Sequence, residues 1–431
     1  MLGRGYWGWF SAIISVLGAR VLASGAAFLG NVLVARQLEP SGYGQFYLLF
    51  TIMTLVAGLT GPAVDTSLVR FAARHIRPER DTSLPYFKLA LYIKLVVFAI
   101  TMLLGVALCV PLFNVLFTPG HGIQPWTVVL AFLGGAAVSL WGFAQSYFQS
   151  HQDFRRYAGF EFFSSSLRLV LVAALLALGS ENVILYLAAY VTAPLLMTGI
   201  SWLQLPRSVY KSSTSGEIGR ELFAFAKWVI LATFFTTLVQ RLDLLLLGYF
   251  DVPKDEVGRY SAAVSLVLLG ELVLLTFYNV LLPKASALRE AGELRLFIGS
   301  FRIPSLLFSL GMGLLLPFAS LLRQIFFGES YTGMEIYFVA LLTGVIVSLS
   351  CAPAVTALYA VGRSNIIAGF EAVRLVVSLC LGLYLAPRYG AIGIAWAMAL
   401  TRSGISVVTY FVAHQKVKRI MIQEYSQEAH D

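Results

Sequence analysis

The chain has 431 residues, of which 58% are apolar and only 12% are charged. Soluble domains are about 25% charged, so this composition excludes a water-soluble globule, a disordered chain, a nucleic-acid-binding protein and a disulfide-stapled secreted fold. The three cysteines, Cys109, Cys351 and Cys380, lie in or beside apolar runs and are expected to pack rather than to form disulfides. Arg20 interrupts the first apolar run and no convincing cleavage site follows, which indicates a retained helix rather than a signal peptide.

Apolar runs bounded by charged residues, proline or glycine predict twelve membrane-spanning helices. They cover approximately residues 11–33, 42–64, 86–110, 127–149, 158–179, 183–205, 223–248, 259–283, 303–322, 335–360, 364–386 and 390–413. No segment between them exceeds about 25 residues, which is too short for a soluble catalytic domain. We therefore expect an all-α polytopic membrane protein that acts inside the bilayer.

Lysine and arginine are divided unevenly between the two sides of this predicted bundle. The connections on the amino-terminal side carry 19 of them, whereas the opposite side carries five, namely Arg36, Lys254, Arg259, Arg323 and Arg388. Cytoplasmic loops carry the excess of positive charge in membrane proteins. Both termini are therefore predicted to be cytoplasmic.

Two sequence patterns recur at about half the chain length. Residues 33–47, LVARQLEPSGYGQFY, align with residues 246–261, LLGYFDVPKDEVGRYS, at an offset of about 213. The tetrapeptide AGFE occurs at residues 158–161 and again at 368–371, an offset of 210, each time at the start of the fifth helix of its half. Matches at two equivalent places predict an internal repeat of six helices.

The repeat predicts two six-helix lobes. We expect an N-lobe over residues 1–205, a basic, serine-containing cytoplasmic linker over 206–222, a C-lobe over 223–413 and a cytoplasmic tail over 414–431. In secondary transporters built this way, the substrate lies in a central cavity between the repeats.

Seven segments in a specific order and spacing carry a resemblance to a known family. They are residues 17–25 (LGARVLASG), 33–46 (LVARQLEPSGYGQF), 68–74 (LVRFAAR), 240–248 (QRLDLLLLG), 257–263 (VGRYSAA), 280–288 (VLLPKASAL) and 326–331 (FFGESY). Together they resemble the polysaccharide flippase family, of the O-antigen and exopolysaccharide type, in the MOP superfamily. Its relatives include multidrug and toxin extrusion (MATE) transporters and lipid II flippases. Such sequences often carry Asp-x-Gly before the LVRF-like segment; here residues 61–63 read GPA, and the acid is displaced to Asp65.

The resemblance implies a transporter rather than an enzyme, with no cofactor. It implies export of a polyprenyl-(pyro)phosphate-linked oligosaccharide by alternating access across the cytoplasmic membrane of a bacterium or archaeon. Coupling to a gradient of H⁺ or Na⁺, contact with membrane lipids and association with polysaccharide assembly proteins are implied as well.

The physical chemistry of such a substrate points to arginines. Each unpaired sugar hydroxyl costs about 2–7 kcal/mol in hydrocarbon, so the path must be polar, and a planar guanidinium suits the phosphate because it can bind two oxygens at once. Three arginines lie within predicted spans without an acid placed to pair in their own helix, so each either lines the cavity or pairs across helices. The substrate-binding candidates are these three, Arg20, Arg241 and Arg402, together with Gln240 and Arg168.

Acids within the spans supply the candidates for ion coupling. Glu271 is mid-span and is either a proton or sodium site or an interhelical hydrogen-bond partner. The other coupling candidates are Asp243 and Asp65. Glu371 and Arg374, three apart on one helix face, are expected to form a structural ion pair. For Lys94 and Lys227, each within about 12 Å of a helix end, snorkelling to the surface is at least as good an explanation as substrate contact. No metal site is predicted.

Three alternatives differ in class. A MATE-like multidrug extruder favours cations, so its lumen should hold acids, whereas the first helix here offers only Arg20. A membrane glycan polymerase or ligase needs an outward acid, base or metal site, and the longest outer loop, residues 111–126, offers only His121. A major-facilitator carrier shares the two-lobe topology, but residues 70–81 lack the glycine, aspartate and basic pattern expected there.

Overall fold

The structure is a computed structural model in which the regular structure is helical. It describes residues 3–76, 82–117, 123–212, 216–286, 288, 291–360 and 364–428. Ten helical segments in this part of the chain are long and apolar enough to cross a membrane. Two of them, Val21–Ala72 with 52 residues and Gly369–Lys416 with 48, are over twice the length of about 20 residues that one crossing needs. Each contains one residue with non-helical angles, Glu39 or Gly390. Dividing both segments there gives the predicted twelve spans.

The chain forms two compact units, unit 1 (Met1–Arg241) and unit 2 (Leu242–Asp431). Unit 1 contains α1 (Gly3–Thr60), α2 (Pro62–His75), α3 (Leu84–Leu116), α4 (Trp126–Ser150), α5 (Phe154–Ala177), α6 (Val183–Leu203), α7 (Arg207–Lys211) and most of α8 (Gly216–Tyr249). Unit 2 contains the end of α8, then α9 (Lys254–Ser286), α10 (Ala291–Gly313), η1 (Leu316–Phe318), α11 (Ala319–Phe326), η2 (Glu329–Tyr331), α12 (Met334–Ala360) and α13 (Ser364–Glu428). The boundary between the units thus falls inside α8 and not in the segment 206–222.

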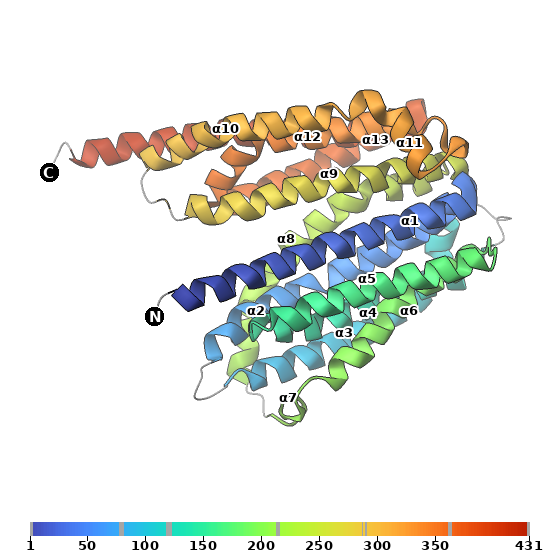
Figure 1. Ribbon diagram of the computed structural model, residues 1–431, viewed down its shortest axis with the longest axis horizontal. Helices are drawn as coiled ribbons and strands as arrows, with labels where there is room; N and C mark the ends of the chain where they lie inside the picture. Colours follow the sequence, from blue (N-terminus) through green and yellow to red (C-terminus); the bar gives the residue numbers. More distant parts are fainter. Residues whose placement is uncertain are drawn as a thin grey trace. The chain divides into compact units, whose positions relative to one another are not determined.

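In unit 1, α4 packs against α1, α2, α3, α5 and α6, and in unit 2, α12 packs against α9, α10, α11 and α13 (Figure 1). Helices α4 and α12 are the most buried of the candidate spans. Glycines allow the close approach. A Cβ atom at Gly135 of α4 would lie 2.5 Å from the Met53 carbonyl oxygen, and one at Gly344 of α12 would lie 3.2 Å from the Ala399 Cα. Because lipid provides no hydrophobic drive between helices, such tight van der Waals contact is what holds membrane helices together.

The turns of the two units recur at matching positions. Glu39 and Asp251 have positive φ angles of 53° and 48° after the first predicted helix of each lobe, and they are 212 positions apart. Gly179 and Gly390, with φ of 65° and 56° before the last predicted helix of each lobe, are 211 positions apart. Positive φ is uncommon outside glycine, so its recurrence at equivalent turns is structural support for the internal repeat.

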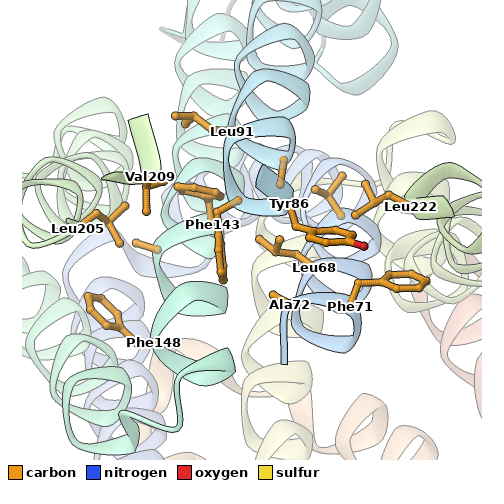
Figure 2. Close-up of a cluster of buried hydrophobic side chains, with 14 of the residues drawn as sticks. Leu68, Phe71, Ala72, Tyr86, Leu91, Phe143, Phe148, Leu205, Val209 and Leu222 are labelled. Atoms are coloured by element: carbon orange, nitrogen blue, oxygen red, sulfur yellow. The ribbon is translucent and has the colours of Figure 1, made fainter. Parts of the chain in front are cut away.

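The segment 206–222, predicted as a linker, is attached to unit 1. Val209 and Leu222 are buried in an apolar cluster whose other large members include Leu68, Phe71, Tyr86, Phe87, Phe143 and Phe148 (Figure 2). The Ser212 carbonyl oxygen accepts a hydrogen bond from Lys88 Nζ at 2.5 Å. These contacts hold α7 and the residue that follows it to α3, and Leu222 of α8 joins the same cluster.

The bounds of two predicted helices are corrected by the structure. The helix expected over residues 42–64 breaks at Gly61, and α2 continues from Pro62 to His75. The helix expected over 303–322 is interrupted after Gly313 by the 3₁₀ turn that contains Pro317. In both cases proline lacks the N–H that an unbroken helix requires.

Candidate functional site

A buried ion pair joins α2 and α3 in unit 1. The Lys94 side chain is fully buried, and its Nζ lies 2.9 Å from both carboxylate oxygens of Asp65. The same Nζ lies 3.1 Å from the Gly61 carbonyl oxygen and 2.8 Å from that of Ser139. Snorkelling is therefore the wrong explanation for Lys94, because the ammonium finds its oxygen partners inside the unit. Lys227, which was considered with it, is exposed.

This pair lies at the break between α1 and α2. Pro62 has no N–H, so the helical hydrogen bonds of this turn are incomplete. Neighbouring helices supply donors to two carbonyls at this break: Ser139 Oγ donates to the Thr60 carbonyl oxygen at 3.0 Å, and Lys94 donates to that of Gly61. Contacts from α3 and α4 therefore stabilise the break between α1 and α2.

Arg168 of α5 is half-buried and has no hydrogen bond or ion pair within the described residues. Its guanidinium carbon lies 5.0 Å from the centre of the Tyr190 ring on α6, and its Nε is buried without a hydrogen-bond partner. Tyr190 is itself fixed, because its hydroxyl donates to Asn31 Oδ1 on α1 at 2.5 Å. Three helices therefore hold one guanidinium on an aromatic face and leave its hydrogen-bonding capacity unused.

The candidates on α8 differ in their surroundings. Gln240 is exposed and Arg241 is half-buried, and for Arg241 the described part of the chain offers no ion pair. Asp243 is buried and accepts a hydrogen bond from the Tyr260 hydroxyl at 2.9 Å. The structure therefore separates Asp243, which is engaged, from Arg241, which is available.

In unit 2, Glu271 of α9 and Arg402 of α13 form a two-pronged ion pair. Arg402 Nη2 donates to Glu271 Oε2 at 2.9 Å, and Nη1 donates to Oε1. The third nitrogen, Nε, donates to Ser348 Oγ on α12 at 3.1 Å, and that hydroxyl pairs with Ser406 Oγ at 2.9 Å. Because each nitrogen already donates one hydrogen bond, Arg402 in this state has no edge with two free N–H groups for a two-pronged phosphate contact.

The other predicted site residues are also accounted for. Arg374 Nη1 lies 3.4 Å from Glu371 Oε2, one turn away on α13. Arg20 lies on α1, but its side chain is outside the described part of the structure. Among the described residues there is no cluster of three or more His, Cys, Asp or Glu side chains that could hold a metal ion.

The sequence identified the charged residues within the spans but not the side chains with which they pair. Asp65 and Lys94 were considered separately, and neither Asn31 nor Tyr190 was singled out. One available signal was that a carboxylate and an ammonium both lie in apolar spans, where an unpaired charge is costly and opposite charges therefore tend to meet. The tyrosine offered no such signal because its ring also suits an apolar core.

Solved structures define the class to which this fold belongs. The chain is similar to a multidrug resistance MATE family transporter of the MOP superfamily in an inward-facing conformation, with a TM-score of 0.75, 15% identity, and coverage of 92% of this chain and 95% of that one. It is similar to the lipid II flippase MurJ in an inward closed conformation, with a TM-score of 0.76, 13% identity and coverage of 95% and 90%. A MOP superfamily transporter from Pyrococcus furiosus gives a TM-score of 0.63 and 14% identity, with coverage of 95% and 94%. The protein is thus a multi-pass membrane protein with the fold of the MOP superfamily.

The chain belongs to the polysaccharide biosynthesis protein family, whose model matches residues 10–288. A search of curated proteins found no match. The predicted family resemblance and the predicted all-helical membrane fold are both confirmed. The roles of the individual site residues stay predictions.

Proposed function

We propose that this protein is a flippase that carries a polyprenyl-(pyro)phosphate-linked oligosaccharide across the cytoplasmic membrane by alternating access. Membership of the polysaccharide biosynthesis family and the MOP fold support a transporter that acts in this process. The excess of lysine and arginine on the amino-terminal side supports cytoplasmic termini, where the substrate and other polysaccharide assembly proteins would be met.

The observation that carries the substrate class is the unpaired guanidinium of Arg168. An arginine within a membrane span costs at least about 2.5–3.5 kcal/mol on insertion scales and is normally paired or in water. Arg168 has no ionic partner among the described residues, and its buried Nε has no acceptor. A phosphate could supply both the charge and the oxygens that this fork lacks.

The remaining substrate contacts are assigned to helices α1 and α8. Arg241 has no partner in the described part of the chain and offers a second cation for a pyrophosphate. Gln240 is exposed and can donate to and accept from sugar hydroxyls. Arg20 provides a third cation, on α1.

Coupling to a cation is assigned to unit 2. H⁺ or Na⁺ arriving at Glu271 would compete with Arg402 for the same carboxylate, so that the two-pronged pair would open. Arg402 would be free to bind anionic substrate only after this release. Asp243 is the secondary coupling candidate because it is buried and held by the Tyr260 hydroxyl.

Transport in proteoliposomes tests the proposal, with a fluorescent lipid-linked oligosaccharide and a membrane-impermeant quencher as the probe of its leaflet. We expect Arg168→Ala to lower the transport rate at least about tenfold and Arg168→Lys to retain part of it, because a lysine keeps the charge but not the fork. The matched control is Arg388→Ala. Arg388 also stacks on a tyrosine, with its guanidinium 4.0 Å from the Tyr384 ring centre, but it is exposed and lies beside the non-helical Gly390 of α13.

Two outcomes would contradict the proposal. An Arg168→Ala variant that transports at the wild-type rate would remove the phosphate contact. Transport of a fluorescent organic cation by the purified protein, without transport of the lipid-linked oligosaccharide, would favour a multidrug extruder instead.

A further inference from the structure

Five oxygen atoms surround the buried ammonium of Lys94. They are the two carboxylate oxygens of Asp65, both at 2.9 Å, the carbonyl oxygens of Gly61 at 3.1 Å and Ser139 at 2.8 Å, and Ser139 Oγ at 3.3 Å. The oxygens come from the α1–α2 break, from α2 and from α4, whereas the ammonium reaches them from α3. We call this group of atoms the oxygen shell.

The oxygen shell holds more acceptors than an ammonium can satisfy. A lysine has three N–H donors, and Asp65 Oδ1 is buried and accepts no hydrogen bond although it lies 2.9 Å from Nζ. Carboxylate, carbonyl and hydroxyl oxygens placed around a single charge are the ligands that proteins offer to alkali and alkaline-earth cations. Three of the five oxygens, Asp65 Oδ2 and the carbonyl oxygens of Gly61 and Ser139, match the three N–H donors, and the other two exceed what the ammonium can bond, as in the coordination shell of an ion.

The size and charge of the oxygen shell favour one kind of cation. Its distances of 2.8–3.3 Å to Nζ are longer than the roughly 2.3–2.6 Å of calcium–oxygen bonds and the 2.0–2.1 Å of magnesium–oxygen bonds. Its single carboxylate balances one positive charge. Both features fit a large monovalent ion such as K⁺ or NH₄⁺.

We propose that the oxygen shell is a monovalent-cation site in which the Lys94 ammonium is the resident, tethered cation. Removal of the Lys94 side chain then opens a site for K⁺ or NH₄⁺ between α2, α3 and α4. A cation on a tether needs no supply from solution, so this part of unit 1 keeps its bent α1–α2 geometry whatever the ion content of the medium. The proposal does not depend on the transported substrate.

Unit 2 shows that the helix contact itself requires no charge. Ser305 Oγ of α10 donates to the Arg302 carbonyl oxygen of its own helix at 2.9 Å and lies 3.4 Å from the Ser350 carbonyl oxygen of α12, across the same separation of 45 residues as Lys94 and Ser139. Ser305 and Ser350 lie 211 positions after Lys94 and Ser139, which matches the offset of the repeat. A neutral hydroxyl thus makes the equivalent contact in unit 2. The packing of these helices does not itself require the charges of the oxygen shell in unit 1.

The experiment measures thermal unfolding of the purified full-length protein in KCl, NH₄Cl, NaCl or choline chloride at equal ionic strength. For Lys94→Ala we expect the unfolding temperature to rise by about 2–5 °C in KCl or NH₄Cl relative to choline chloride, because a ligand that binds only the folded state stabilises it. Bound ⁸⁶Rb⁺ should be retained by this variant. The wild type, the Asp65→Asn/Lys94→Ala variant and the matched control Ser305→Ala should show neither effect.

Equal unfolding temperatures of Lys94→Ala in all four salts, without bound ⁸⁶Rb⁺, would overturn the proposal. If Lys94→Ala does not fold in any salt, the test passes to Lys94→Gln, whose amide can still donate to the carbonyls of the oxygen shell. The proposal then requires Asp65→Asn/Lys94→Gln to unfold at a higher temperature than Lys94→Gln. In the single variant the buried Asp65 carboxylate is left without a cation, whereas the double variant carries neither charge. An unchanged or lower unfolding temperature of the double variant would show that Asp65 does not depend on a cation.

Discussion

In unit 1, α3 meets the central helix α4 through Lys94 and Ser139, whereas in unit 2, α10 meets the central helix α12 through Ser305 and Ser350. The spacing is the same, and turns with positive φ recur after the first and before the last predicted helix of each lobe. The side chains at these matching places nevertheless differ in charge. The repeat therefore preserves the backbone structure, whereas the charged side chains differ between the two units.

Arg374 and Arg402 of unit 2 each pair with an acid, whereas for Arg168 and Arg241 of unit 1 the described residues offer no ion pair. Arg402 pairs with Glu271, and Arg374 pairs with Glu371. In unit 1, Lys94 pairs with Asp65, but Arg168 has no ionic partner in the described part of the chain. The comparison is consistent with contact to an anionic substrate in unit 1 and a releasable ion pair in unit 2.

The largest effect should come from breaking the Glu271–Arg402 pair. Removing one partner of a buried pair costs about 3–5 kcal/mol because the other charge is left uncompensated. The Glu271 side chain is 35% exposed, so we expect Glu271→Gln to lose about 3 kcal/mol, the lower end of that range, measured as a lower unfolding temperature in detergent. The double variant Glu271→Gln/Arg402→Met should recover most of the loss.

The comparison control is Glu371→Gln. Its pair is longer, at 3.4 Å, and joins neighbouring turns of one helix, so the loss should stay near 1 kcal/mol or below. Equal losses of stability for Glu271→Gln and Glu371→Gln would show that the ion pair between α9 and α13 adds no stability beyond that of a pair within one helix.

The next effect concerns the place that Asp65 occupies against α4. A Cβ atom at Gly142 would lie 2.5 Å from Asp65 Oδ2, so Gly142→Ala should push the carboxylate away from Lys94. Overpacking of this kind typically costs about 1–3 kcal/mol, and we expect about 2 kcal/mol in thermal unfolding. Gly159→Ala is the matched control, because a Cβ atom there meets nothing within 4 Å and alanine favours the helix by up to about 1 kcal/mol. A Gly142→Ala variant as stable as Gly159→Ala would mean that the carboxylate can move freely.

A smaller effect is expected when the platform under Arg168 is loosened. Tyr190→Phe keeps the ring but removes the hydroxyl that donates to Asn31, which should cost about 1 kcal/mol and lower the transport rate a few-fold. The control is Tyr384→Phe, which removes the hydroxyl from the ring under the exposed Arg388 and should leave the stability and the transport rate unchanged. Unaltered transport by Tyr190→Phe would show that the position of Arg168 does not depend on this hydrogen bond.

The fold was predictable from sequence to a greater extent than the site. Runs of apolar residues report bilayer crossings directly, and the recurrence of AGFE at residues 158–161 and 368–371 located the fifth helix of each half. The break at Gly61 escaped prediction because hydropathy does not change across a bend. The pairing of Glu271 with Arg402, 131 residues apart, could not be read from one sequence, because which faces of distant helices meet depends on packing.

The smallest expected effect tests whether the neutral contact in unit 2 only supports packing. Ser305→Ala removes a hydroxyl that donates to the Arg302 carbonyl oxygen at 2.9 Å and makes a long contact of 3.4 Å with the Ser350 carbonyl oxygen. Hydrogen bonds between membrane helices average about 0.6 kcal/mol. We expect a loss of about 0.5 kcal/mol in thermal unfolding and an unchanged transport rate. Ser139→Ala in unit 1 removes both the donor to the Thr60 carbonyl oxygen and one oxygen near Lys94, so its loss should be larger, about 1 kcal/mol. If Ser305→Ala lowered the stability more than Ser139→Ala, the contacts of Ser139 in the oxygen shell would not be what holds α3 and α4 together at the helix break.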